Sequence, residues 1–367
     1  MQDGVVEIIK KAEDLRQKSK YKEALCLFKK ALSASKKQSN LSGVLDSTIA
    51  IADIYRMTGN FDYAISNYNE ALEICEALGD ELSVADSMVG LGLSVRALGM
   101  WKEAVRFSLK ARRIYEMKKD KRGIAFSVWA EAGALRFGGN VLMAIKKFKE
   151  SKDIFSSAKY TSGIAYAQCG LGGTHRLAGR FNESLRYYNR ANKIFHRLKD
   201  RFGKAYSHCG IGNAYRMMDN YSEAMNHFRK AARLYEDIGD IVSYSYTLWS
   251  IATLYKMKMD FVNAGLYIKK ALKNFKKTKD PRGTIYCDLA QGEMEYMHGR
   301  HTTAHKKFLA AKSAAERYGF KLEKCHADML LQFINISKGK TAIFRKHPCY
   351  KKLGLNLNFS SMPFNIP

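Results

Sequence analysis

A cation recurs at forty-residue intervals along this chain of 367 residues. The cation column consists of Arg16, Arg56, Arg96, Arg136, Arg176, Arg216 and Lys256. A planar guanidinium group holds a carboxylate or a phosphate through two parallel hydrogen bonds. A ladder of such groups could therefore bind an extended anionic chain.

An aromatic residue recurs at the same interval and forms a second column. Its members are Phe126, Tyr166, Tyr206, Tyr246 and Tyr286. Aromatic rings could hold apolar side chains or stack on nucleic-acid bases. In the stretch 201–240, Tyr206, Cys209, Asn213 and Arg216 are spaced to form one stripe along a helix, which makes Asn213 a further candidate for binding.

Both columns also have a structural interpretation, and the residues leave it open. Each cation falls in the last turn of an expected helix, where positive charge complements the helix dipole and free carbonyl groups accept hydrogen bonds. Each cation could also pair with an acidic residue of the neighbouring repeat. The aromatic rings could pack between successive helices.

The elements that carry these columns come from an internal repeat. Alignment of the chain on itself at an offset of forty residues agrees without gaps from about residue 12 to residue 311. One small-residue column reads Ala24, Ala64, Ala104, Ala144, Ser184, Ala224, Ala264 and Ala304. Within each repeat the apolar spacing predicts two helices, with small residues where the helices approach each other.

Turn and capping residues predict where these helices begin and end. A glycine suited to a left-handed turn follows the first helix at Gly59, Gly99, Gly139, Gly179 and Gly299. N-cap residue types open the second helix at Asn60, Asn140, Asn220 and Asp260. The next repeat is expected to begin behind the caps Asp80, Asp120, Asp200, Asp240 and Asp280.

The repeat resembles the tetratricopeptide repeat (TPR). The residues that carry the resemblance are Ile211-Gly212, Tyr215-Arg216, Tyr221, Glu223-Ala224, Phe228 and Ala231. The period exceeds the roughly 34 residues of the common form, and is similar to that of the LGN/Pins scaffolds and kinesin light chains. The resemblance implies an all-α, right-handed superhelical solenoid of about eight units, whose first helices line a concave groove.

The periodicity also sets the expected domain limits. Residues 1–320 are predicted to form the solenoid and residues 321–340 a capping helix. Residues 341–367 lose the period, and we predict an irregular basic and apolar tail with exposed apolar side chains. This tail could dock into the groove of a neighbouring copy or into its own groove, so self-association through it is a further hypothesis.

Composition excludes several classes of protein. Hydrophobic residues make up 46% of the chain, which excludes a disordered protein, and no apolar run is long enough for a membrane span. No signal peptide is evident at the N-terminus. The seven cysteines show no paired spacing and are predicted to be reduced thiols in the cytoplasm.

Charge and motifs lead to a hypothesis about function. The formal net charge is +27, although residues 41–80 carry one basic and seven acidic residues. Nucleotide-loop, zinc-protease and serine-hydrolase motifs are missing, so we predict no catalytic activity, no cofactor and no metal site. The leading hypothesis is a scaffold or adaptor that binds an extended, acidic peptide or partner protein in its groove. The alternative is an RNA-binding helical-repeat protein.

Overall fold

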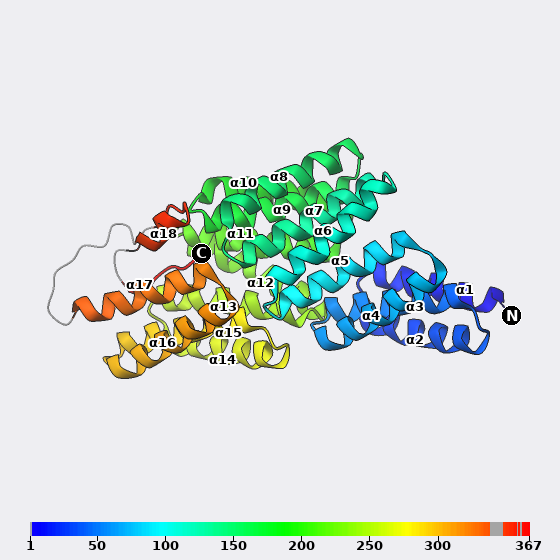
Figure 1. Ribbon diagram of the computed structural model, residues 1–367. Helices are drawn as coiled ribbons and strands as arrows, with labels where there is room; N and C mark the ends of the chain where they lie inside the picture. Colours follow the sequence, from blue (N-terminus) through cyan, green and yellow to red (C-terminus); the bar gives the residue numbers. More distant parts are fainter. Residues whose placement is uncertain (1, 338–347, 358, 360–361) are drawn as a thin grey trace.

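The computed structural model describes residues 2–337, 348–357, 359 and 362–367, and these residues contain helices but no strand. Successive helices pack on one another along the chain and form a curved array (Figure 1). The first helices of the eight pairs are α1 (Gln2–Gln17), α3 (Leu41–Met57), α5 (Glu81–Ala97), α7 (Lys121–Phe137), α9 (Thr161–Leu177), α11 (Arg201–Met217), α13 (Ile241–Met257) and α15 (Pro281–Met297). The second helices are α2 (Tyr21–Lys37), α4 (Phe61–Leu78), α6 (Trp101–Met117), α8 (Val141–Ser157), α10 (Phe181–Arg197), α12 (Tyr221–Ile238), α14 (Phe261–Lys277) and α16 (His301–Tyr318).

Two helices follow the eight pairs. They are α17 (Lys321–Ser337) and the short α18 (Pro348–Lys352). The prediction of an all-helical repeat solenoid is confirmed, and from α3 onward the first helices begin forty residues apart. Residues 338–340 of the predicted capping helix, and residues 341–347, 358, 360 and 361 of the predicted tail, lie outside the described residues.

The predicted turn glycines have the backbone conformation that their position requires. Gly59, Gly99, Gly139, Gly179 and Gly299 all have positive φ angles, between 77° and 94°. All five aspartates between repeats accept a hydrogen bond from the following helix, for example Asp200 from the main-chain N–H of Gly203 at 2.8 Å. Asn220 and Asp260 cap their helices, whereas the Asn60 and Asn140 side chains do not.

Small residues allow the two helices of a repeat to approach. Phe228 of α12 is fully buried, and a Cβ atom at Gly212 of α11 would lie 2.7 Å from its ring. Burial of a phenylalanine side chain contributes about 1.5–3 kcal/mol. Replacement of Gly212 by a larger residue would push this ring out of its packed position.

The array curves until distant repeats touch. In the second repeat, the Asp62 carboxylate accepts from Lys279 of the seventh repeat at 2.5 Å. The Trp101 indole of the third repeat donates to the Tyr318 carbonyl of the eighth at 3.2 Å. Each of these contacts joins a repeat to the one five positions further along the chain. Neighbouring turns of the superhelix therefore contact each other.

The C-terminal residues correct one prediction. Apolar residues beyond α17 were expected to be exposed, but the described residues among them are mostly buried. Those that are buried are Tyr350, Leu355, Leu357, Met362, Phe364 and Ile366. They belong to the largest hydrophobic cluster of the molecule, together with residues of α15 and α17. The prediction failed because burial here depends on contacts between segments far apart in the sequence, which no local periodicity records.

The cysteines correct a second prediction. Cys325 of α17 and Cys349 of α18 form a disulfide bond, with Cα atoms 5.8 Å apart. The prediction that all seven thiols are reduced was therefore wrong for this pair, because the fold brings together two cysteines that lie 24 residues apart. The other five cysteines are free thiols, and four of them are buried or half-buried.

Candidate binding groove

Every member of the cation column lies in the last turn of a first helix. Four of these side chains, those of Arg16, Arg96, Arg136 and Lys256, contact the first helix of the next repeat. A Cβ atom at Gly173 would lie 2.7 Å from the Arg136 guanidinium, and Arg96 lies against Gly133 in the same way. The position reached is thirty-seven residues beyond the cation.

Cations near the ends of the column have acidic partners at this position. Arg16 lies 3.4 Å from the Asp53 carboxylate and also pairs with Glu13 at 2.7 Å. Asp53 in turn accepts from Arg56 at 2.9 Å. These neighbouring cations hold the Asp53 pKa below its usual value despite burial, so this part of the column is neutralised.

A buried ion pair neutralises the other end. Lys256 of α13 donates to Glu293 of α15, and the two side chains are 2% and 0% exposed. Burial lowers the Lys256 pKa, and burial raises the Glu293 pKa, since each charged group has lost its water. The pair therefore lies between α13 and α15, shielded from solvent.

The central cations have no such partner. Among the residues that the structure describes, no carboxylate forms an ion pair with Arg96, Arg136, Arg176 or Arg216. The Nε groups of Arg96, Arg176 and Arg216 are buried without a hydrogen-bond partner. Burial and the neighbouring Arg136 lower the pKa of Arg96 to about 10, and burial and Arg176 lower the pKa of Arg216 to about 9. The middle of the cation column therefore carries positive charge that no carboxylate among the described residues compensates.

The residue type at one repeat position explains this difference. The position three residues before each of the seven cations, and before Tyr296 in the last repeat, reads Glu13, Asp53, Leu93, Gly133, Gly173, Asn213, Thr253 and Glu293. From Asp53 onward, this position lies thirty-seven residues beyond the preceding cation. Acidic residues occupy this position only in the first two repeats and in the last one. We call these eight residues the gating column, because they determine which cations are neutralised.

The aromatic column packs against neighbouring helices. Tyr166 lies 4.8 Å from Phe195 between ring centres and donates to Asp200 at 2.7 Å. Tyr246 lies edge-on against Phe275, and Tyr286 packs against Trp249. Phe126 is 37% exposed and stacks on Trp129, and Tyr206 contacts Tyr188 and Phe202. These rings have structural contacts, as one of the two interpretations anticipated.

Half of the predicted site residues meet at one cavity of about 190 Å³. Arg136, Arg176, Tyr206, Asn213, Tyr246 and Tyr286 contribute to its wall. Arg56, Arg96, Phe126, Tyr166, Arg216 and Lys256 do not line it. The cavity also receives Arg282, which the sequence analysis missed and which pairs with Glu323 of α17 at 2.5 Å.

A segment of the chain itself lies next to this cavity and contacts the cation column. The two Nη atoms of Arg216 donate to the Asn365 side-chain carbonyl and, at 2.9 Å, to the Ile366 main-chain carbonyl. The Asn365 amide donates back to the Arg216 carbonyl at 2.8 Å. Asn213, a predicted site residue, accepts from Arg216 at 3.1 Å.

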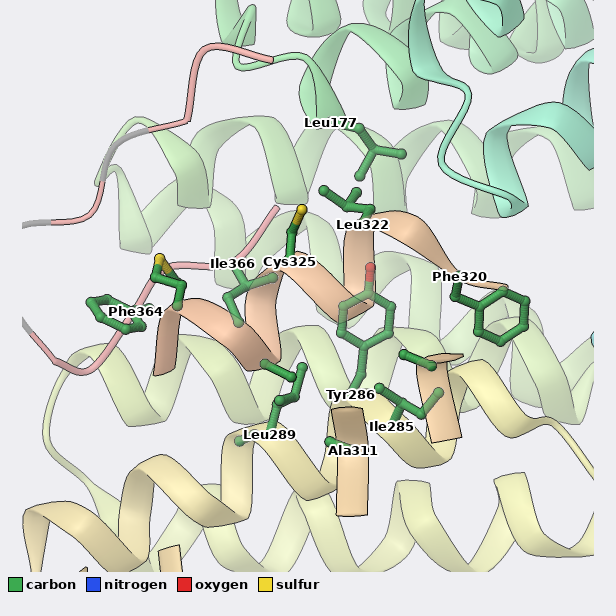
Figure 2. Packing of buried hydrophobic residues seen from close by; sticks show 14 of the residues in the cluster. Leu177, Ile285, Tyr286, Leu289, Ala311, Phe320, Leu322, Cys325, Phe364 and Ile366 are labelled. Carbon is green, nitrogen blue, oxygen red and sulfur yellow. The ribbon is translucent and has the colours of Figure 1, made fainter. Parts of the chain in front are cut away.

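The buried Lys256–Glu293 ion pair holds Phe364, the residue before Asn365, by its main-chain groups. Lys256 donates to the Phe364 carbonyl at 3.0 Å, and the Phe364 N–H donates to Glu293 at 2.6 Å. Figure 2 shows Phe364 and Ile366 beside α17, in the cluster that contains Leu289. We call Met362–Pro367 the groove segment.

Comparison with known proteins agrees with this architecture. The sequence profile of the tetratricopeptide repeat matches residues 43–117 and 163–237. These two stretches consist of tetratricopeptide repeats, and we refer to the chain that contains them as the TPR protein. No curated protein matches this TPR protein in sequence. Membership of the subclass with a forty-residue period remains a prediction.

Solved structures share the fold at low sequence identity. A Rap protein complexed with competence and sporulation factor is 12% identical, with a TM-score of 0.60, over 92% of this TPR protein and 99% of that chain. The Rap conjugation gene regulator of the plasmid pLS20, in complex with the Phr* peptide, is 15% identical, with a TM-score of 0.66. The match covers 86% of this TPR protein and 95% of that chain. The apo form of RapI is 13% identical, with a TM-score of 0.53, over 75% and 99%.

Two other features bear on the earlier predictions. None of the helices in the described part of the TPR protein has both the length and the apolar character that crossing a bilayer requires. Within those same residues, no three histidine, cysteine or acidic side chains lie close enough to hold a metal ion. A cytoplasmic location and self-association through the C-terminal residues stay predictions.

Proposed function

We propose that this TPR protein is a non-catalytic scaffold whose groove binds an extended, acidic segment of a partner protein. The observation that carries the proposal is the group of central arginines without acidic partners, two of which, Arg136 and Arg176, line the cavity. Arg136 and Arg176 are half-buried, and a cation that has lost part of its water without gaining a counter-ion reduces stability, so a ligand carboxylate would offset that cost.

Magnitudes favour the groove over the convex face as the specific site. A hydrogen bond to a charged group contributes about 1.5–3 kcal/mol when it is shielded from water. An ion pair on an exposed surface contributes about 0–1 kcal/mol and is screened by salt. The many lysines on the second helices therefore attract anions in general, whereas the inner arginines can select one.

Three further observations support a peptide rather than RNA. The groove already holds main-chain atoms of Phe364 and Ile366, which is the kind of contact that an extended peptide makes. Base stacking needs free ring faces, and Tyr166, Tyr246 and Tyr286 pack against neighbouring aromatic rings. Two of the similar solved structures are complexes, one with the Phr* peptide and one with competence and sporulation factor.

Selection from a phage library of random ten-residue peptides tests the proposal. Wild-type protein should enrich peptides rich in Asp and Glu, and the Arg136→Gln/Arg176→Gln variant should bind the same peptides at least about tenfold more weakly. A matched control, Arg113→Gln/Arg229→Gln, removes two exposed arginines from second helices and should keep wild-type affinity. Enrichment without acidic residues, or equal losses in both variants, would contradict the proposal.

A further inference from the structure

The groove segment is held in the way that a peptide-binding groove holds a ligand. Both main-chain polar groups of Phe364 are satisfied by the Lys256–Glu293 pair. Arg216 holds both the side chain of Asn365 and the carbonyl of the next residue. The contacts thus combine main-chain recognition, which any extended peptide offers, with two hydrogen bonds of the Asn365 side chain. Its carbonyl accepts and its amide donates, and this combination selects asparagine.

The apolar residues on either side of Asn365 are buried in separate hydrophobic contacts. Phe364 and Ile366 are each 2% exposed. The Phe364 ring lies edge-on to Phe333 of α17, with 5.5 Å between ring centres. An apolar residue, an asparagine and a second apolar residue therefore form the pattern that this part of the groove accepts.

The groove segment also has a direction. Phe364 contacts α13 and α15, and Asn365 and Ile366 contact α11. Pro367 lines the cavity whose wall also includes Arg176 of α9 and Arg136 of α7. The segment therefore runs from later repeats to earlier ones. A peptide bound in the same register would place the residues that follow the Pro367 position beside Arg176 and then Arg136.

We infer that Met362–Pro367 is an intramolecular occupant of the groove, and that the partner's segment replaces it in the same direction, with carboxylates following an apolar-Asn-apolar core. The inference rests on the proposed function, and specifies the partner of that same site. An occupant on the same chain competes at a high effective concentration, so it sets the affinity that a partner must exceed.

Synthetic peptides test the inference on the full chain. The first probe carries residues 362–367 followed by two glutamates, and the second carries the same two glutamates before residue 362. Each probe has a fluorescein label, and fluorescence anisotropy measures its affinity. Asn365→Ala weakens the occupant, whereas Asn356→Ala changes an exposed asparagine of the same C-terminal region and serves as its matched control.

Three results are expected. Asn365→Ala should bind the first probe at least about tenfold more tightly than wild type and than Asn356→Ala, since a lost hydrogen bond to a charged group corresponds to about that factor. In the Asn365→Ala chain the first probe should bind at least about tenfold more tightly than the second. The added change Arg176→Gln should abolish the difference between the two probes. Thermal unfolding followed by circular dichroism should show that Asn365→Ala remains folded.

Contrary results separate this inference from the proposed function. Equal binding of the first probe by wild type and Asn365→Ala, with loss of binding in Arg176→Gln, would overturn the intramolecular occupant and leave the acidic-peptide groove intact. Equal binding of the two probes would overturn the direction. Failure of both probes to bind any variant, together with failure of the phage selection, would overturn the inference and the proposed function alike.

Discussion

Arg96 of the third repeat lies against Gly133 of the fourth, at the position where Arg16 of the first repeat meets the Asp53 carboxylate. The two contacts have the same spacing in the sequence and differ only in the residue reached. Asp53 also accepts from Arg56, three residues further along its own helix. One acidic residue of the gating column therefore neutralises two members of the cation column.

Transfer of this acid to the fourth repeat should neutralise the centre of the groove. In Gly133→Asp, the new carboxylate should pair with Arg96 and, three residues on, with Arg136. We expect the free energy of unfolding to rise by about 1–2 kcal/mol, since a buried cation gains a charged partner and the helix loses a glycine. Urea denaturation would measure the gain. Affinity for acidic peptides should fall at least about tenfold in the anisotropy assay.

Gly133→Asn is the control for this substitution. Asparagine has nearly the same size as aspartate and no charge, so it should leave peptide affinity within about threefold of wild type, which corresponds to well under 1 kcal/mol. If Gly133→Asn and Gly133→Asp weakened peptide binding equally, bulk at residue 133 would explain the loss. The neutralisation argument would then be wrong.

The gating column could have been read from the sequence. The alignment that revealed the cation column also places Glu13, Asp53 and Glu293 in register three residues before a cation or its equivalent. A helical i, i+3 pair is a local relationship, so it follows from spacing alone. Helix limits and the capping aspartates were predictable for the same reason.

Contacts between distant segments could not be predicted in this way. Arg216 and Asn365 lie 149 residues apart, and the groove segment has no counterpart in any repeat. The Cys325–Cys349 bond and the entry of Arg282 into the cavity likewise depend on the path of the chain after α16. Periodicity describes how each repeat packs on the next and contains no information on where a non-repeating segment returns.

The Lys256–Glu293 pair should be costly to break from one side only. Lys256→Met leaves a buried carboxylate without its cation, and Glu293→Gln leaves a buried ammonium without its anion. Each single change should lower the free energy of unfolding by about 3–5 kcal/mol. The double variant Lys256→Met/Glu293→Gln should lose less than the sum of the two, because no unpaired charge remains. Urea denaturation of the four proteins gives the coupling energy, and additive losses would mean that the two charges do not interact.

Asp240 should make stability depend on pH, because burial raises its pKa to about 6. The unfolded chain releases this proton near pH 4. Between pH 4 and pH 6 the folded protein therefore binds more protons than the unfolded chain, and the free energy of unfolding falls as pH rises through that window. Above pH 6 the loss is complete.

Asp240→Asn removes this titration and retains the cap, since asparagine accepts from the Ser243 N–H equally well. We expect the variant to exceed wild type in stability at pH 7 by about 1–3 kcal/mol and to match it near pH 4. Thermal unfolding across this range would measure the gap. Asp260→Asn is the control: hydrogen bonds from Asn263 lower the Asp260 pKa, so its removal should bring no gain at pH 7. A gap at Asp240 that stayed constant with pH would exclude burial of its charge as the cause.

The Cys325–Cys349 bond anchors α18, and through it the approach to the groove segment. α18 also carries Tyr350, whose hydroxyl group lies 2.6 Å from the ring nitrogen of His326 on α17. Closure of a loop of this length restricts the unfolded chain, so Cys349→Ser should lower the free energy of unfolding by about 3 kcal/mol. The same loosening should lower the effective concentration of the groove segment and raise affinity for the first peptide probe.

Dithiothreitol should reproduce both effects in wild type and change nothing further in Cys349→Ser. Cys26→Ser, which alters an exposed free thiol, should behave as wild type in both assays. A stability loss without a gain in peptide affinity would mean that the disulfide anchors α18 alone. The groove segment would then be held by Arg216, Lys256 and Glu293 whether or not α18 is fixed to α17.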